Sequence, residues 1–153
     1  MTLDALLAAA HHLAVFSLVS LLVVELVTVR APMGRDDILR FGRFDAAYGI
    51  AAVAVIVVGI GRLVFGAVPV DFYFTNLFFW LKMASLGAIA LISVYPTMRG
   101  QAWRKAAEAD AGFQATASDV RLVRRALHVE LAILPLIPIS AALMARGIGT
   151  FAG

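Results

Sequence analysis

The stretch FDAAYGIAAVAVIVVGIGRLVFG, residues 44–66, decides the fold. A helix that crosses the hydrocarbon core of a bilayer needs about 20 mostly apolar residues, and this stretch is long enough. Asp45, Tyr48 and Arg62 are the only strongly polar side chains in it. Since backbone groups in lipid must form their hydrogen bonds within the segment, the stretch predicts a membrane-spanning helix rather than a strand.

Three further segments have the same character, at residues 5–29, 74–97 and 122–146. We therefore expect an all-α polytopic membrane protein, a single domain over residues 1–153 built as a bundle of four transmembrane helices. The helix-breaking run Ala31-Pro32-Met33-Gly34 ends the first segment. Residues 67–73 are expected to form a short turn and residues 98–120 the only long loop. Ser118 or Asp119 is the expected cap of the last helix.

The composition agrees with this expectation. Hydrophobic residues make up 62% of the 153 residues, charged residues only 15%, and mean hydropathy is +0.92. Soluble domains have about 45–50% apolar and about 25% charged residues, so an ordinary soluble globule is excluded. The chain has no cysteine, which excludes disulfides, thiolate metal sites and cysteine catalysis. The net charge of +3 lies beside the apolar segments, and we expect the lipid bilayer, not nucleic acid, as the partner.

The positive charges also predict an orientation. Ten of the 13 Lys and Arg residues lie between segments one and two or around residues 98–125. The positive-inside rule assigns that side to the cytoplasm. Both termini then lie outside, which means the periplasm if the protein sits in a bacterial inner membrane. The first segment is expected to remain as a helix, because it lacks the basic start of a signal peptide.

Ionisable residues inside spanning helices are costly and mark candidate functional sites. One group falls in the half of the segments nearest the cytoplasm: Glu25, Asp45, Tyr48, His128 and Glu130. This group suggests ion or proton transport, for which four helices would need to oligomerise. The alternative is structural, with Glu25 paired to Arg30 or Arg43.

A second group falls in the outer half of the segments. Its members are His11, His12, Arg62, Lys82 and Arg146, with the methionines Met83 and Met144 at similar depth. This group predicts a b-type haem site. His12 or His11 would ligate the iron, a methionine would supply a second ligand, and the three cations would hold the propionates. The alternative is that the histidines donate to backbone carbonyls while the cations reach the lipid headgroups.

Helical spacing, at 100° per residue, tests which polar groups face the interior together. On the first segment His11, Leu18, Leu22 and Glu25 lie near one face. On the third segment Lys82, Ser85, Ile89, Ser93 and Pro96 share a face. On the fourth, His128 and Arg146 are 18 residues apart, which is five turns, and are expected to share an inward face.

Several short motifs resemble an uncharacterised family of bacterial four-helix membrane proteins. They are Leu3-Asp4-Ala5-Leu6-Leu7, His11-His12-Leu13-Ala14-Val15-Phe16, Glu25 with Arg30, Arg43-Phe44-Asp45 with Tyr48-Gly49, Asn76 with Phe79-Trp80-Leu81-Lys82, Tyr95-Pro96-Thr97, and Ala141 to Gly147. The resemblance covers nearly the whole chain and implies the four-helix fold without assigning an activity.

The early histidine, the arginine closing the first segment and Trp80-x-Lys82 are similar to the CopD-like group of membrane proteins. That group includes the haem-binding protoporphyrinogen oxidase of the HemJ type. The resemblance implies functional roles for His11 or His12, Trp80 and Lys82. Val29-Arg30 stand where HemJ-type proteins have a second histidine.

Two other classes of function stay open beside haem binding and proton transport. The chain fits an accessory or assembly subunit of a larger membrane complex, since small residues on its helices favour close helix contact. Copper handling is the other class, with two adjacent histidines and five methionines as possible ligands. An enzymatic role is left undecided, because the sequence has no phosphate-binding glycine loop, HExxH or GxSxG motif.

Overall fold

The computed structural model describes residues 3–151, and within them it consists of six helices and their connections. The helices are α1 (Leu3–Thr28), α2 (Arg35–Phe65), α3 (Val70–Phe74), α4 (Leu77–Ala109), α5 (Ala117–Ile133) and α6 (Leu136–Ala145). Two isolated β-bridges, Met33 with Ala115 and Asn76 with Thr150, are the only strand-like pairings in the described part of the chain.

Four helical segments are long and apolar enough to cross a membrane: α1, α2, α4, and α5 with α6 taken together. The chain is therefore a multi-pass, all-α membrane protein, as the sequence predicts. The outer surface of these helices is apolar. Leu13, Phe16, Ile50 and Leu91 each expose two thirds or more of their surface, which suits contact with lipid tails.

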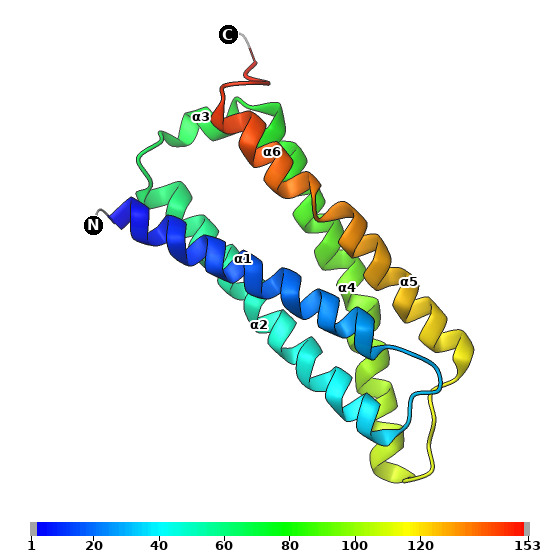
Figure 1. Cartoon of the computed structure of the whole chain (residues 1–153). Coiled ribbons are helices and arrows are strands. Elements are labelled where there is room, and N and C mark those ends of the chain that lie inside the picture. Colours follow the sequence, from blue (N-terminus) through cyan, green and yellow to red (C-terminus); the bar gives the residue numbers. More distant parts are fainter. Residues whose placement is uncertain (1–2, 152–153) are drawn as a thin grey trace.

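The helices form two arms (Figure 1). One arm is the antiparallel pair α1 and α2, and the other is α4 with α5 and α6 packed along it. The arms meet where α2 contacts α4 and where α1 contacts α5. Both termini lie at one end, which we call the terminal end. The other end carries the connections 29–34 and 110–116, and we call it the arginine-rich end.

Several predicted boundaries are wrong. The expected turn at 67–73 contains most of helix α3, the third segment begins at Leu77 rather than at residue 74, and the last begins at Ala117 rather than at residue 122. Helix α2 begins at Arg35 rather than at residue 44, α4 continues to Ala109, and only residues 110–116 of the expected loop 98–120 are non-helical. Hydropathy finds the part of a helix that lies in lipid and misses the part beyond it. At 1.5 Å per residue, the 33 residues of α4 extend about 50 Å, well beyond a hydrocarbon core of about 30 Å.

The ends of the last segment also differ from expectation. The N-cap of α5 is Thr116, whose hydroxyl accepts from the backbone N–H of Asp119 at 3.3 Å, not Ser118 or Asp119. The segment breaks between α5 and α6 at Pro135, because proline lacks the N–H that an uninterrupted helix requires. The expected inward stripe of His128 and Arg146 is wrong, since both side chains are exposed.

The densest part of the core lies toward the arginine-rich end. Leu22, Ile38, Phe41 and Leu127 are buried there. The Phe41 and Trp103 rings pack with centroids 6.2 Å apart, and both belong to helical turns beyond the predicted segments. These extra turns therefore close the bundle at the arginine-rich end.

Gly100 permits a close approach of α2 to α4, which generates a stability prediction. A Cβ atom at Gly100 would lie 2.6 Å from Cε1 of Phe41, whereas a Cβ at Gly87 on the same helix meets nothing within 4 Å. We expect Gly100→Ala to lower the free energy of unfolding by about 1–3 kcal/mol, as overpacking does. Thermal unfolding in detergent measures the change.

Gly87→Ala is the matched control, because it adds the same methyl group to α4 in open space. It should leave stability unchanged or raise it by up to about 1 kcal/mol. Equal stability of the two variants would contradict the close packing of Phe41 on Gly100.

Candidate functional site

A carboxyl cluster joins four helices inside the bundle. It consists of Glu25 on α1, Asp45 and Tyr48 on α2, Ser93 and Thr97 on α4, and Glu130 on α5. Glu25 and Glu130 are 1% and 0% exposed, so two acidic side chains lie in the interior of an apolar protein. The structure therefore brings together four of the five residues that the sequence groups by depth.

Glu130 is the centre of the hydrogen-bond network. Its Oε2 atom accepts from the Tyr48 hydroxyl at 3.0 Å and lies 2.8 Å from Oγ of Ser93. The Ser93 hydroxyl is also 2.9 Å from the Ile89 carbonyl on its own helix. One carboxyl oxygen thus ties α2 and α4 to α5 at a single level.

A second link lies one turn closer to the arginine-rich end. The Thr97 hydroxyl donates to Oδ1 of Asp45 at 2.7 Å, again joining α4 to α2. Ser93 belongs to the polar stripe predicted on the third segment. Thr97 is four residues further along the same face. Helical spacing could therefore have predicted Thr97 as a member of the site, whereas its depth in the membrane could not.

Glu25 differs from its neighbours because it lacks a partner. Its Oε1 atom is buried and receives no hydrogen bond within the described residues. The two ion pairs found in residues 3–151 are Arg99 with Asp119 and Arg104 with Glu108, so the proposed pairing of Glu25 with Arg30 or Arg43 is absent from that part of the chain. Asp45 and Glu130 lie within electrostatic range of Glu25.

Arg124, on the same helix as Glu130, binds backbone carbonyls rather than a carboxyl group. The Nη1 atom of Arg124 donates to the carbonyls of Leu26 and Val29, both at 2.9 Å, and so caps the end of α1. Arginine near a helix C-terminus satisfies carbonyls that the helix leaves free.

His128 was predicted to belong to the cluster and lies outside it. Its side chain is exposed, and Nδ1 donates to the Arg124 carbonyl at 2.7 Å.

A basic cluster lies nearer the terminal end. Its members are His11 on α1, Arg62 on α2 and Lys82 on α4, all half-buried and within electrostatic range of one another. Nδ1 of His11 and Nε of Arg62 are buried without a hydrogen-bond partner in the described residues. The His11 ring packs on Gly59, where a Cβ would lie 3.5 Å from Cε1.

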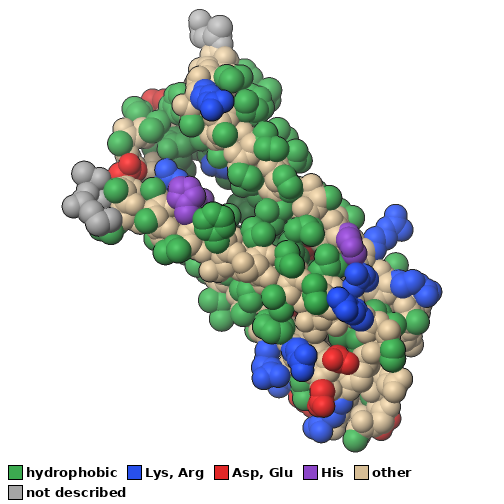
Figure 2. All heavy atoms as spheres, in the orientation of Figure 1, with side chains coloured by type: hydrophobic (Ala, Val, Ile, Leu, Met, Phe, Trp, Pro, Cys, Tyr) green, Lys and Arg blue, Asp and Glu red, His purple; other side chains and the backbone are tan. Residues whose placement is uncertain are grey.

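A hollow opens between the two arms near the terminal end, the same end toward which the basic cluster lies (Figure 2). The space-filling view shows histidine and basic side chains near this hollow, with apolar side chains on the surrounding surface. Lys82 also lies over the Phe79 ring, its Nζ atom 5.4 Å from the centroid. Within residues 3–151 no acidic side chain forms an ion pair with Arg62 or Lys82.

The four other residues predicted for the outer site, His12, Arg146, Met83 and Met144, lie outside the basic cluster. His12 is exposed, and its Nδ1 donates to the Ala8 carbonyl at 2.7 Å. Arg146 is exposed beyond the end of α6. Met83 is half-buried on α4, and Met144 is buried on α6, so both sulfur atoms belong to the arm opposite His11.

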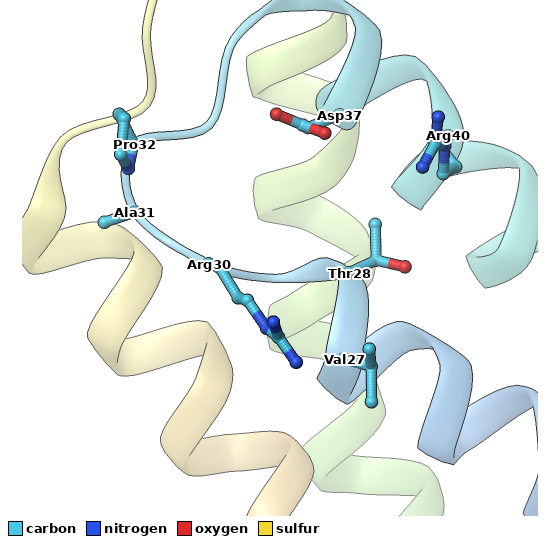
Figure 3. Close-up of a pocket in the computed structure, with 7 residues that line it drawn as sticks. All are labelled: Val27, Thr28, Arg30, Ala31, Pro32, Asp37 and Arg40. Carbon is cyan, nitrogen blue, oxygen red and sulfur yellow. The ribbon is translucent and has the colours of Figure 1, made fainter.

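A shallow pocket of about 260 Å³ opens where α1 ends and α2 begins (Figure 3). Arg30, Asp37 and Arg40 line it, together with Val27, Thr28, Ala31 and Pro32. None of these residues belongs to the carboxyl cluster or the basic cluster. The pocket is therefore a feature of the arginine-rich end and separate from both interior sites.

The fold and these interior polar sites define a polytopic membrane protein with four spanning segments. Residues 3–149 match the family described as predicted membrane protein DUF2214, and the chain belongs to that family. No curated protein and no solved structure matches the chain. The family confirms the membrane class, and its description assigns no activity.

The Glu130 network generates a second stability prediction. Ser93→Ala removes one of two interhelical donors to Oε2 of Glu130, and Tyr48→Phe removes the other. Interhelical hydrogen bonds in membranes contribute about 0.6 kcal/mol on average and up to about 1.7 kcal/mol. We expect each variant to lose stability within this range, measured by denaturation in detergent.

Ser17→Ala is the matched control, since the Ser17 hydroxyl is exposed and donates to the Leu13 carbonyl of its own helix at 2.9 Å. It should change stability by less than Ser93→Ala does. If the two serine variants unfold identically, the network does not hold the helices together.

Proposed function

We propose that the protein binds b-type haem in the hollow beside the basic cluster. The observation that carries the proposal is the convergence of an imidazole and two cations from three helices. Nδ1 of His11 and Nε of Arg62 are buried and have no hydrogen-bond partner among residues 3–151. Haem presents an iron that takes histidine and two carboxylates that take cations. The residues present fit these two requirements.

Each residue would have a distinct role. His11 would ligate the iron, while Arg62 and Lys82 would hold the propionates in place of the missing acidic partners. Bound haem would supply a one-electron redox centre. The apolar walls of the hollow would exclude water from the macrocycle, and Met83 or Met144 on the facing arm remains the candidate for a second ligand.

Copper handling receives less support than haem. Among residues 3–151 no three His, Asp or Glu side chains gather closely enough to hold a metal ion, so a copper site would need methionine ligands. Haem iron needs only one or two protein ligands because the porphyrin supplies four. The absence of such a group is therefore compatible with haem.

The proposal predicts a protein-bound Soret band in the detergent-purified protein, either as isolated or after haem addition and removal of the unbound haem. His11→Ala should lack this band, because it would remove the proposed iron ligand. Arg62→Met should weaken haem affinity about tenfold or more, since a charge-assisted hydrogen bond contributes about 1.5–3 kcal/mol. Absorbance spectra of the oxidised and dithionite-reduced protein measure both effects.

The two other histidines provide matched controls. His12→Ala tests the exposed neighbour of His11, and His128→Ala removes an exposed histidine far from the basic cluster. Both variants should keep the Soret band. A flat visible spectrum after haem addition and removal of the unbound haem would contradict the proposal and favour an accessory subunit of a membrane complex.

We further propose that the arginine-rich end faces the cytoplasm of a bacterial inner membrane, with both termini in the periplasm, as ten of 13 cations indicate. Because the chain has no cysteine, a single introduced thiol reports one position unambiguously. In intact cells an impermeant maleimide should label Asp71→Cys and spare Lys105→Cys. If only Lys105→Cys were labelled, the proposed orientation would be wrong and the arginine-rich end would face the outside.

A further inference from the structure

The carboxyl cluster contains three acidic side chains and no basic side chain that pairs with them within residues 3–151. Glu25, Asp45 and Glu130 form no ion pair among residues 3–151. An ionised carboxylate buried away from water is costly unless it is paired with a cation and hydrogen-bonded. The charge of the cluster must therefore be reduced by something that binds there.

A metal ion does not fit that role. A shared cation needs several carboxylates around one point, and no group of three acidic or histidine side chains in the described residues meets that condition. A carboxyl group whose charge is removed must then be neutralised by itself, without sharing a ligand with its neighbours. A proton is the one ligand that neutralises a single carboxyl without requiring a second.

The unpaired oxygen atoms identify where protons fit. Oε1 of Glu25 and Oε1 of Glu130 have no hydrogen-bond partner within the described part of the chain, and the two residues are only 1% and 0% exposed. Oε2 of Glu130 has two hydroxyl groups near it, so Glu130 has compensation for a negative charge. Glu25 has none of this compensation.

We propose that the carboxyl cluster is a proton-binding site in which Glu25 carries the proton at neutral pH. Uptake joins one proton from water to one Glu25 oxygen and converts a carboxylate to a neutral carboxylic acid. This site is independent of the haem proposal, since it shares no residue with the basic cluster.

The groups around Glu25 all agree with this assignment. From α2 it faces Asp45 and Tyr48, and from α5 it faces Glu130, so ionisable acids surround it. Helix α4 supplies only the hydroxyls of Ser93 and Thr97 at this level. Arg124 on α5 is directed to the carbonyls of Leu26 and Val29, and His128 is exposed.

Asp45 connects the cluster to the arginine-rich end. Its side chain is half-buried and accepts from Thr97, one helical turn closer to that end than Ser93. Toward the terminal end, the buried side chains include the apolar Leu22 and Ile89 and also the hydroxyl-bearing Ser85. The half-buried Asp45 is therefore the member of the cluster through which we place proton entry.

The chain has three glutamates, Glu25, Glu108 and Glu130, which makes a direct test possible. The protein is labelled with ¹³C at the glutamate carboxyl carbons, and the three signals are followed by NMR in detergent while the pH is varied. Glu25→Gln, Glu108→Gln and Glu130→Gln assign the signals. If Glu25→Gln does not fold, the other two variants assign Glu25 by elimination.

The expected result is a protonated chemical shift for Glu25 at neutral pH and an ionised shift for Glu108. Glu108 is exposed and paired with Arg104 at 2.8 Å, so it is the internal control. As pH rises, ionisation of Glu25 should destabilise the folded wild type, while Glu25→Gln should keep its stability. An ionised Glu25 signal at neutral pH would overturn the proposal.

Discussion

The two hydroxyl groups that approach one oxygen of Glu130 are the interaction on which the bundle depends. Lipid tails supply neither water nor a hydrophobic force between helices, so polar contacts in the interior select how apolar helices align. Tyr48 and Ser93 can both reach Glu130 only if α2, α4 and α5 keep one relative register. The packing of Phe41 against Gly100 and Trp103 follows from that register.

The interior of the bundle holds its two kinds of charge at different depths. Most of the exposed cations gather at the arginine-rich end, the carboxyl cluster lies nearer that end, and the basic cluster lies nearer the terminal end. Arg124 illustrates how the opposite charges are kept apart, since its guanidinium caps α1 instead of pairing with Glu25. Two interior sites of opposite charge therefore exist in a chain of only four spanning segments.

The sequence predicts what hydropathy and helical spacing encode. The four spanning segments, the inward stripe from Lys82 to Pro96 and the grouping of Glu25 with Glu130 all follow from it. The amphipathic turns at 35–43 and 98–109 were missed, although Ile38 and Phe41, and Trp103 and Ala107, are three or four residues apart. His128 was misplaced because depth along a helix says nothing about the direction of a side chain.

The distance between the two clusters limits how strongly they influence each other. Lys82 and Ser93 lie 11 residues apart on α4, which corresponds to about 16 Å along the helix. Two unit charges at that separation interact by about 1 kcal/mol at an effective dielectric constant of about 20. An anion at the basic cluster would therefore favour a proton at the carboxyl cluster by less than tenfold. Tighter coupling would require movement of the two arms, and α1, α2 and α4 each carry residues of both clusters.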